Sequence, residues 1–322
     1  MIMKDIDPKI LEQVKKLEQK YEAMGQDLSS YLDGLLHSDY LTYWDYIHLD
    51  TLLSLQNPKT HFPDEKIFII YHQITELYFK LILNEIEQLA FEDPKDAALF
   101  LTRLKRVNRY LLHLVDSFDV MIDGMDQNQF LQFRMSLLPA SGFQSGQLRL
   151  IEFSSTPMIN LTERSVRAEL EGQDIESLYP HLYWKKGATE LATGKKTLTL
   201  RQFEEKYADE FVRHAQRYAA DNIWSKYKSS YEGGEANAEI VEQLRHLDLL
   251  ANVNWRLAHY KSAVRYLQKD PDIIAATGGT NWQQYLPPRF QKVIFYPELW
   301  SKKEIEDWGK SWVEETVFNL KK

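Results

Sequence analysis

The stretch FPDEKIFIIYHQITELYFKLILNEI, residues 62–86, decides the fold class of this chain. Pro63, Asp64 and Glu65 suit the first turn of a helix, where proline loses no hydrogen bond and acidic side chains face unpaired N–H groups. Apolar residues then recur at three- and four-residue spacings, the period of one helix face. This apolar series consists of Ile67, Ile70, Tyr71, Ile74, Leu77, Tyr78 and Leu81.

Helical periodicity also dominates the rest of the chain. Glycine is scarce, with 13 residues, and few segments alternate apolar and polar residues as strands do. The sequence therefore predicts an all-α fold, with residues 1–322 forming one domain. Further helices are expected from roughly Pro8 to Met24, from Asp93-Pro94 to Gly124, from near Asp126 and from about Ala238 to Gln268. The second of these has a predicted core side of Leu101, Leu104, Val107, Leu111, Leu114 and Phe118.

Local capping signals predict two more helix starts. Thr199 followed by Gln202 resembles a capping box, in which two side chains satisfy N–H groups of the first turn. Ser301 followed by Glu304 has the same form. The stretch SSYEGGEANAE, residues 229–239, is expected to be an exposed loop.

The composition narrows the classes of protein and site. The 322 residues include no cysteine, which excludes disulfides, iron–sulfur clusters and cysteine-based zinc sites. The first residues lack an apolar signal-peptide region, and no apolar run is long enough to span a membrane, so we expect a cytoplasmic protein. The net charge of −8 argues against nucleic acid as a partner.

Two histidines lie inside strongly predicted helices. His72 is one turn after Phe68, and His259 is one turn after Trp255. The chain has no zinc HExxH, P-loop, GxGxxG or GxSxG motif, so a helix-borne imidazole beside an aromatic ring is the clearest candidate ligand for a flat cofactor. The alternative is that both are ordinary core or surface histidines with a hydrogen-bond partner.

Arg134 shares a predicted helix face with Phe130, Phe133 and Leu137. A guanidinium on an apolar face requires an anion, and a carboxylate suits it best because two parallel hydrogen bonds can form. That carboxylate could belong to a ligand or to an Asp or Glu of the protein. The turn Thr277-Gly278-Gly279 could offer N–H groups and a hydroxyl to an anion, or could be a plain loop turn.

Three sequence blocks, in chain order, resemble the tryptophan 2,3-dioxygenase family. They are YWDYIHLDTLLSLQ at residues 43–56, the opening stretch with its FII-x-HQ-x-x-EL pattern, and FLQFRMSLLPASGFQSGQLRLIEF at residues 130–153. His259 and the Thr277-Gly278-Gly279 turn extend the resemblance towards the C-terminus. Each block alone is moderately specific, whereas their combination over residues 43–153 is strong.

The resemblance implies a haem b cofactor whose iron is ferrous in the active state. His259 matches the family's proximal iron ligand, and Gly278 is expected among the residues that bind the cofactor. His72 matches the distal histidine, which hydrogen-bonds the indole N–H of the substrate. Phe68 matches the aromatic wall against the indole.

The resemblance also implies where the amino-acid end of L-tryptophan binds. Arg134 matches the arginine that clamps the substrate carboxylate, and Thr277 matches the threonine that meets its ammonium and carboxylate groups. Phe130 occupies a substrate-binding position at which some family members carry tyrosine. Residues 1–60 are expected to contact a neighbouring subunit, whose pocket they complete with Tyr43, Tyr46 and Ile47.

The resemblance implies a single all-α helical-bundle domain of the tryptophan/indoleamine dioxygenase type, assembled as a homotetramer. The implied reaction inserts both atoms of O2 across the indole C2–C3 bond of L-tryptophan to give N-formylkynurenine, the first step of the kynurenine pathway of tryptophan degradation. Because such a cofactor carries the difficult chemistry, the protein is expected to supply orientation and electrostatics. Neither nucleic acid nor a membrane is expected as a partner.

Two other functions stay open on the sequence alone. Ala276 and Thr280-Asn281 depart from the residues that the family carries beside Thr277. The chain could therefore be another haem-dependent oxygenase of the same superfamily, acting on a substituted indole or another aromatic amino acid. It could also be a non-catalytic helical protein that binds tryptophan or haem, although His72 and Arg134 together favour an enzyme.

Overall fold

The computed structural model describes residues 6–38, 42–91, 96–137, 142–189, 194–269, 272–273 and 287–310. The chain divides into two units, residues 1–56 and 57–322. Helices account for nearly all the regular structure of the described ranges, and the predicted all-α class is confirmed. The exception is a short antiparallel pair, β1 (Gln268–Lys269) with β2 (Asp272–Ile273).

The described residues of the first unit form four helices, which are α1 (Pro8–Ala23), α2 (Leu28–Leu36), α3 (Tyr43–Tyr46) and α4 (Leu49–Leu53). The predicted helix from Pro8 is confirmed, and Asp7 caps it by accepting a hydrogen bond from the Lys9 N–H. None of these four helices contains a buried residue. The described part of this unit therefore has no core of its own, and its apolar side chains need another surface to cover them.

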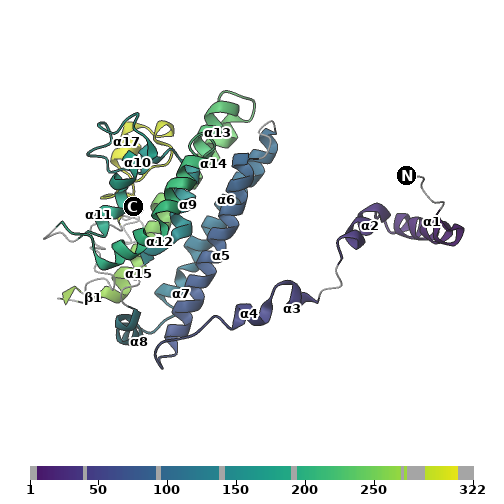
Figure 1. The fold of residues 1–322 in the computed structure, drawn as a ribbon, viewed down its shortest axis with the longest axis horizontal. Helices are drawn as coiled ribbons and strands as arrows, with labels where there is room; N and C mark the ends of the chain where they lie inside the picture. Colours follow the sequence, from purple (N-terminus) through teal and green to yellow (C-terminus); the bar gives the residue numbers. More distant parts are fainter. Residues whose placement is uncertain are drawn as a thin grey trace, which may run out of the picture. The chain divides into compact units, whose positions relative to one another are not determined.

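In the second unit, two long helices, α5 (Asp64–Phe91) and α6 (Ala97–Ser117), lie side by side (Figure 1). The following helices are α7 (Asp119–Ile122), α8 (Gln127–Phe133), η1 (Arg134–Leu137), η2 (Gly142–Gln144), α9 (Gly146–Ser155), η3 (Met158–Leu161), α10 (Ile175–Leu178), η4 (Tyr179–His181), α11 (Tyr183–Gly187), α12 (Leu198–Arg217), α13 (Ile223–Ser230), α14 (Asn237–Leu249), η5 (Leu250–Asn254), α15 (Trp255–Leu267), η6 (Pro297–Leu299) and α17 (Lys302–Glu306). Among the described residues, no helix is long and apolar enough to cross a membrane.

The main core lies where α5 and α6 pack against α9, α12 and α14. A second apolar cluster forms where α5, α7 and α15 meet, and it includes Tyr71, Phe118, Met121, Ala258 and Tyr266. The predicted core side of α6 is confirmed, since all six of its predicted residues are buried. The helix begins at Ala97 with Asp96 as its cap, and Asp93-Pro94 lies outside the described residues.

The predicted helix at residues 62–86 is confirmed as α5, but its apolar series does not mark the buried face. Ile70, Ile74, Leu77 and Leu81 are between 39% and 49% exposed. The buried face instead carries Tyr71, Thr75, Phe79, Ile82, Glu85, Ile86 and Leu89. Apolar residues occur nearly all round this helix, so periodicity alone could not indicate which side meets the core.

Of the two predicted capping boxes, one is wrong and one is confirmed. The cap of α12 is Thr197, whose hydroxyl accepts a hydrogen bond from the Leu200 N–H at 3.2 Å, so the capping box predicted at Thr199 is wrong. Thr199 lies inside the first turn and is buried. The Ser301–Glu304 capping box is confirmed at the start of α17.

The predicted single helix from 238 to 268 is divided by a π-helical segment, η5, between α14 and α15. Directly before it, the buried Asp248 carboxylate accepts hydrogen bonds from the Asn252 side chain and the Trp300 indole at 2.8 and 3.0 Å. It also accepts the backbone N–H groups of Phe295 and Tyr296 at 2.9 and 3.1 Å. Burial raises the pKa of Asp248 to about 6, although these four donors favour its ionised form. Through these hydrogen bonds, Asp248 holds residues 295–300 against α14.

Replacing this carboxylate by an amide should destabilise the protein. In Asp248→Asn, one oxygen that accepts hydrogen bonds becomes an NH2 group facing other donors, so buried N–H groups lose their acceptor. We expect the free energy of unfolding to fall by about 2–4 kcal/mol. Urea denaturation at pH 8 measures the change, with the exposed Asp116→Asn as matched control. Equal midpoints for the two variants would contradict the role given to Asp248.

Candidate active site

His72 on α5 has a defined protonation state and tautomer. Its Nδ1 lies 2.7 Å from the backbone oxygen of Phe68, one turn earlier. A carbonyl oxygen can only accept, so Nδ1 donates and Nε2 keeps a free lone pair. Burial lowers the pKa of His72, which keeps the ring neutral near pH 7. The result is a hydrogen-bond acceptor at Nε2 on an otherwise apolar wall.

Aromatic rings surround this imidazole. The Phe68 ring lies 4.1 Å from the His72 ring, between centroids. Phe133 meets Phe68 edge-on at 5.9 Å, and Phe130 lies 6.2 Å from Phe68. Phe130 in turn contacts Tyr266 of α15 at 4.7 Å. The fold therefore brings together three of the predicted site residues, Phe68, His72 and Phe130, from α5 and α8.

Arg134 follows the buried Phe133 directly and is only 7% exposed. It lies at the junction of α8 and the 3-10 turn η1, so the predicted continuous helix changes its pitch at this residue. Burial lowers the pKa of Arg134 from its usual value, which is far above neutrality. The side chain therefore remains a cation, and it follows Phe133 of the aromatic cluster directly in the sequence.

His259 occupies α15, where its ring stacks on Phe118 at 5.8 Å with 24° between the planes. Burial, with a smaller contribution from the positive charge of Arg256, lowers the pKa of His259 to about 4. The ring is therefore neutral near pH 7, the form in which imidazole binds a metal. Ring contacts link the two imidazoles, since Phe118 lies 5.7 Å from Tyr71 and Tyr71 lies 5.8 Å from His72.

Gly142 of η2 passes close to His259. A Cβ atom at this position would lie 3.4 Å from Cε1 and 3.7 Å from Nε2 of the His259 ring. Any side chain would therefore enter the space beside the ring nitrogen. The sequence indicated Gly142 only as part of the SGFQS block. Its place in that block was the one signal for a role beside His259.

A buried charge network lies behind His259. Arg149 on α9 donates to the Glu152 carboxylate and to the Tyr183 hydroxyl, both at 2.7 Å. The Tyr183 hydroxyl donates to Glu152 and accepts a hydrogen bond from Arg256 at 2.8 Å. Arg256 precedes His259 by nearly one turn of α15. Sequence reasoning missed these residues, although a charged i, i+3 pair within the apolar stretch LRLIEF was a visible signal.

For five predicted site residues, the described part of the second unit gives no position. Thr277 and Gly278 lie outside the described residues. Tyr43, Tyr46 and Ile47 belong to the first unit, on α3 and at its C-cap. Tyr43 and Tyr46 are 69% and 73% exposed.

The site offers few ligands for a metal ion. Within the described ranges, no three His, Asp or Glu side chains gather as a metal-binding group. His259 could therefore supply a single protein ligand, as in sites where a porphyrin provides the other ligands. The same enclosure could take a flat aromatic substrate against Phe68 and a carboxylate at Arg134.

Comparison with known proteins agrees with this chemistry. The profile of a family described as tryptophan 2,3-dioxygenase matches residues 35–232. A tryptophan 2,3-dioxygenase of Ruegeria pomeroyi is 32% identical over 275 residues, covering 81% of this chain and 91% of the relative. A tryptophan 2,3-dioxygenase of Bacillus thuringiensis is 30% identical, covering 83% and 94%. One of Exiguobacterium sibiricum is 28% identical, covering 86% and 98%.

Proposed function

The chain belongs to the tryptophan 2,3-dioxygenase family, and from this premise we propose that it inserts both atoms of O2 across the indole C2–C3 bond of L-tryptophan. The product is N-formylkynurenine, which keeps every atom of the amino acid and of the dioxygen. No external reductant is therefore consumed. The observation that carries the proposal is the aromatic enclosure, which places a neutral imidazole acceptor, His72, against the Phe68 ring.

The residues of the site fit a haem group. His259 is a neutral imidazole inside an aromatic cluster, and the missing side chain of Gly142 leaves space beside its Nε2 atom. We propose that His259 holds the iron of haem b and that Gly278 contributes to the cofactor pocket. When bound, a ferrous haem would supply the activation of dioxygen.

The remaining residues bind and orient the substrate. The Nε2 atom of His72 accepts a hydrogen bond from the indole N–H, because Nδ1 already donates to the Phe68 backbone oxygen. The Phe68 ring and Phe130 provide the apolar surface against the indole. Arg134 takes the carboxylate, where its buried position strengthens a paired hydrogen bond. Thr277 is assigned to the ammonium and carboxylate groups.

We also propose a homotetramer in which Tyr43, Tyr46 and Ile47 complete the pocket of a neighbouring subunit. The first unit supports this, since its described helices bury no residue. The second unit contributes an exposed apolar stripe on α5, formed by Ile70, Ile74, Leu77 and Leu81. Apolar surfaces of this kind mark protein interfaces more often than free surface. The cytoplasmic location stays a prediction.

Removing the His259 imidazole should remove the cofactor. Purified wild-type protein is expected to show a Soret band and one haem per chain. His259→Ala should lose most of that haem, because no other ligand replaces the imidazole. His72→Ala is the matched control, since it should retain haem and lose turnover. Stoichiometric haem in His259→Ala, measured by absorbance and iron analysis, would overturn the ligand assignment.

Neutralising Arg134 should weaken binding of the substrate carboxylate. In Arg134→Gln, we expect the dissociation constant of L-tryptophan to rise by roughly ten- to a hundredfold, the loss typical of one charge-assisted pair. Calorimetric titration of the haem-loaded protein measures it. Tryptamine, which lacks the carboxylate, is the control ligand and should bind wild type and variant alike. An unchanged tryptophan affinity would count against the clamp.

The product identifies the reaction. After anaerobic reduction, addition of L-tryptophan and 18O-labelled dioxygen should give N-formylkynurenine with both labelled atoms, detected by mass spectrometry. A product with a single labelled atom would instead indicate a monooxygenase of the same superfamily. Saturable binding of tryptophan without any product would indicate a binding protein.

A further inference from the structure

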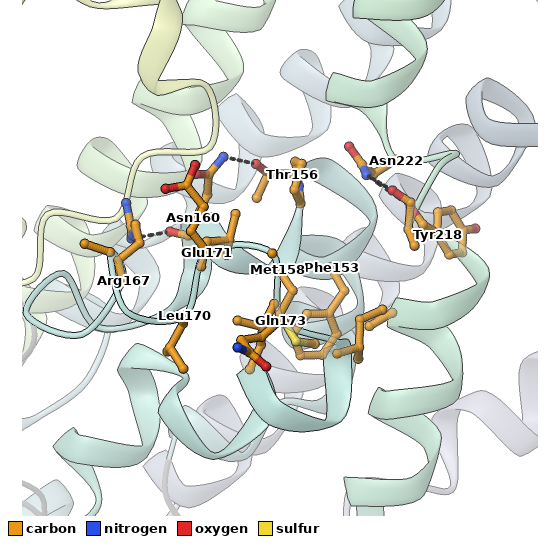
Figure 2. A pocket seen from close by; sticks show the side chains of 18 of the residues that line it. Phe153, Thr156, Met158, Asn160, Arg167, Leu170, Glu171, Gln173, Tyr218 and Asn222 are labelled. Carbon is orange, nitrogen blue, oxygen red and sulfur yellow. Dashed lines mark hydrogen bonds between the residues drawn. The ribbon is translucent and has the colours of Figure 1, made fainter.

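A separate pocket of about 680 Å3 lies in the second unit, between η3, the turn that follows it, α10 and the junction of α12 with α13. None of the candidate active-site residues lines it. Its volume is within the range of small-molecule binding sites, roughly 300–1,000 Å3. Figure 2 shows Arg167 and Asn160 on one side of the pocket and Tyr218 and Asn222 on the other.

The floor of this pocket is apolar. Phe153, Met158, Leu178 and Ala215 line it and are buried. Leu170 and Ile175 extend the same surface towards the opening. The floor could therefore cover an apolar or aromatic group of a ligand.

The polar end of the pocket is dominated by Arg167. Its Nη2 donates to the backbone oxygens of Asn160 and Thr162 at 2.8 and 2.9 Å (Figure 2 shows one such bond). Its Nε atom is buried without a hydrogen-bond partner. Among the described residues, no ion pair involves Arg167 or Arg164, which lines the same pocket. Glu163, next to Arg164 in the chain, pairs with Lys186, and Asp221 pairs with Lys226. The guanidinium is thus held in place by neutral groups and retains its full charge.

Further positive charge gathers around this arginine. Burial and the neighbouring Arg164 lower the pKa of Arg167 to about 10, so it is still a cation at neutral pH. Burial, followed by the charge of Arg164, also lowers the pKa of Lys292. The Lys292 ammonium donates to the backbone oxygens of Ile305 and Glu306 at 3.0 and 2.8 Å rather than to a carboxylate. In a chain of net charge −8, the Arg164 charge acts on both Arg167 and Lys292, so this region attracts an anion.

One acidic residue, Glu171, also lines the pocket and is exposed. Its charge opposes the entry of a phosphate or a dicarboxylate more strongly than that of a single carboxylate. The pocket therefore favours an anion of one negative charge.

We propose that this pocket binds a small monocarboxylate with an apolar or aromatic body, the carboxylate at Arg167 and the body on the floor formed by Met158 and Leu178. The site is independent of the one proposed for tryptophan. Its ligand would stabilise the turn between η3 and α10, since that turn supplies Arg164 and Arg167.

The test is calorimetric titration of the purified full-length protein with 4-phenylbutyrate, and with 4-phenylbutyramide as its neutral counterpart. Arg167→Gln removes the proposed anion partner, and Ala168→Trp fills the pocket from an exposed lining position. Arg213→Gln, an exposed arginine of α12 outside the pocket, is the matched control. Arg134→Gln reports any binding of the probe at the proposed tryptophan site.

The wild type, Arg213→Gln and Arg134→Gln should bind 4-phenylbutyrate equally. Arg167→Gln and Ala168→Trp should each bind it about tenfold more weakly or worse, and so should the wild type with the amide. If Arg167→Gln does not fold, Ala168→Trp decides. Equal binding of carboxylate and amide, no saturable binding at millimolar probe, or a loss in Arg134→Gln alone would overturn the proposal.

Discussion

The buried network of Arg149, Glu152, Tyr183 and Arg256 is the interaction on which the geometry of the candidate active site depends. It joins α9, α11 and α15 through charge-assisted hydrogen bonds shielded from water. Losing one partner of such a buried group costs about 3–5 kcal/mol, because the other charges stay buried. The relative positions of α9 and α15 are therefore tightly defined. Gly142 lies just before α9 and His259 lies just after Arg256, so the network also sets how closely the glycine backbone approaches the imidazole.

Burial lowers the pKa of each ionisable group of the site but leaves these groups in different charge states. It lowers the pKa values of His72 and His259 and leaves both rings neutral, as a hydrogen-bond acceptor and a metal ligand require. The pKa of Arg134 is lowered too, but from so high a value that the guanidinium stays charged. The same burial can therefore leave two imidazoles neutral and one guanidinium charged. That combination suits an aromatic amino acid, which has an indole N–H, a ring and a carboxylate.

Helix α9 extends between the candidate active site and the pocket lined by Arg167. Its first residues follow the turn that contains Gly142, and its end, at Ser155, lies between two residues of the second pocket, Phe153 and Thr156. A helix of 10 residues is about 15 Å long. Arg149 and Glu152 occupy the middle of this helix, so the charge network fixes an element that extends between the two regions.

The sequence by itself determined which segments are helical and where some of them begin, because caps depend on side chains within a few residues of each other. Ser301 caps α17 as predicted, and the regular apolar stripe of α6 is the stripe that is buried. Family blocks in the sequence also indicated Phe68, His72, Phe130, Arg134 and His259 as site residues. Only the tertiary structure decided which side of α5 meets the core, because that helix is apolar on more than one side. It alone decided the approach of Gly142 to His259 and the pairing of Arg149 with Arg256 through Tyr183. These contacts join residues far apart in the chain, and no local pattern records which distant surface a side chain will meet.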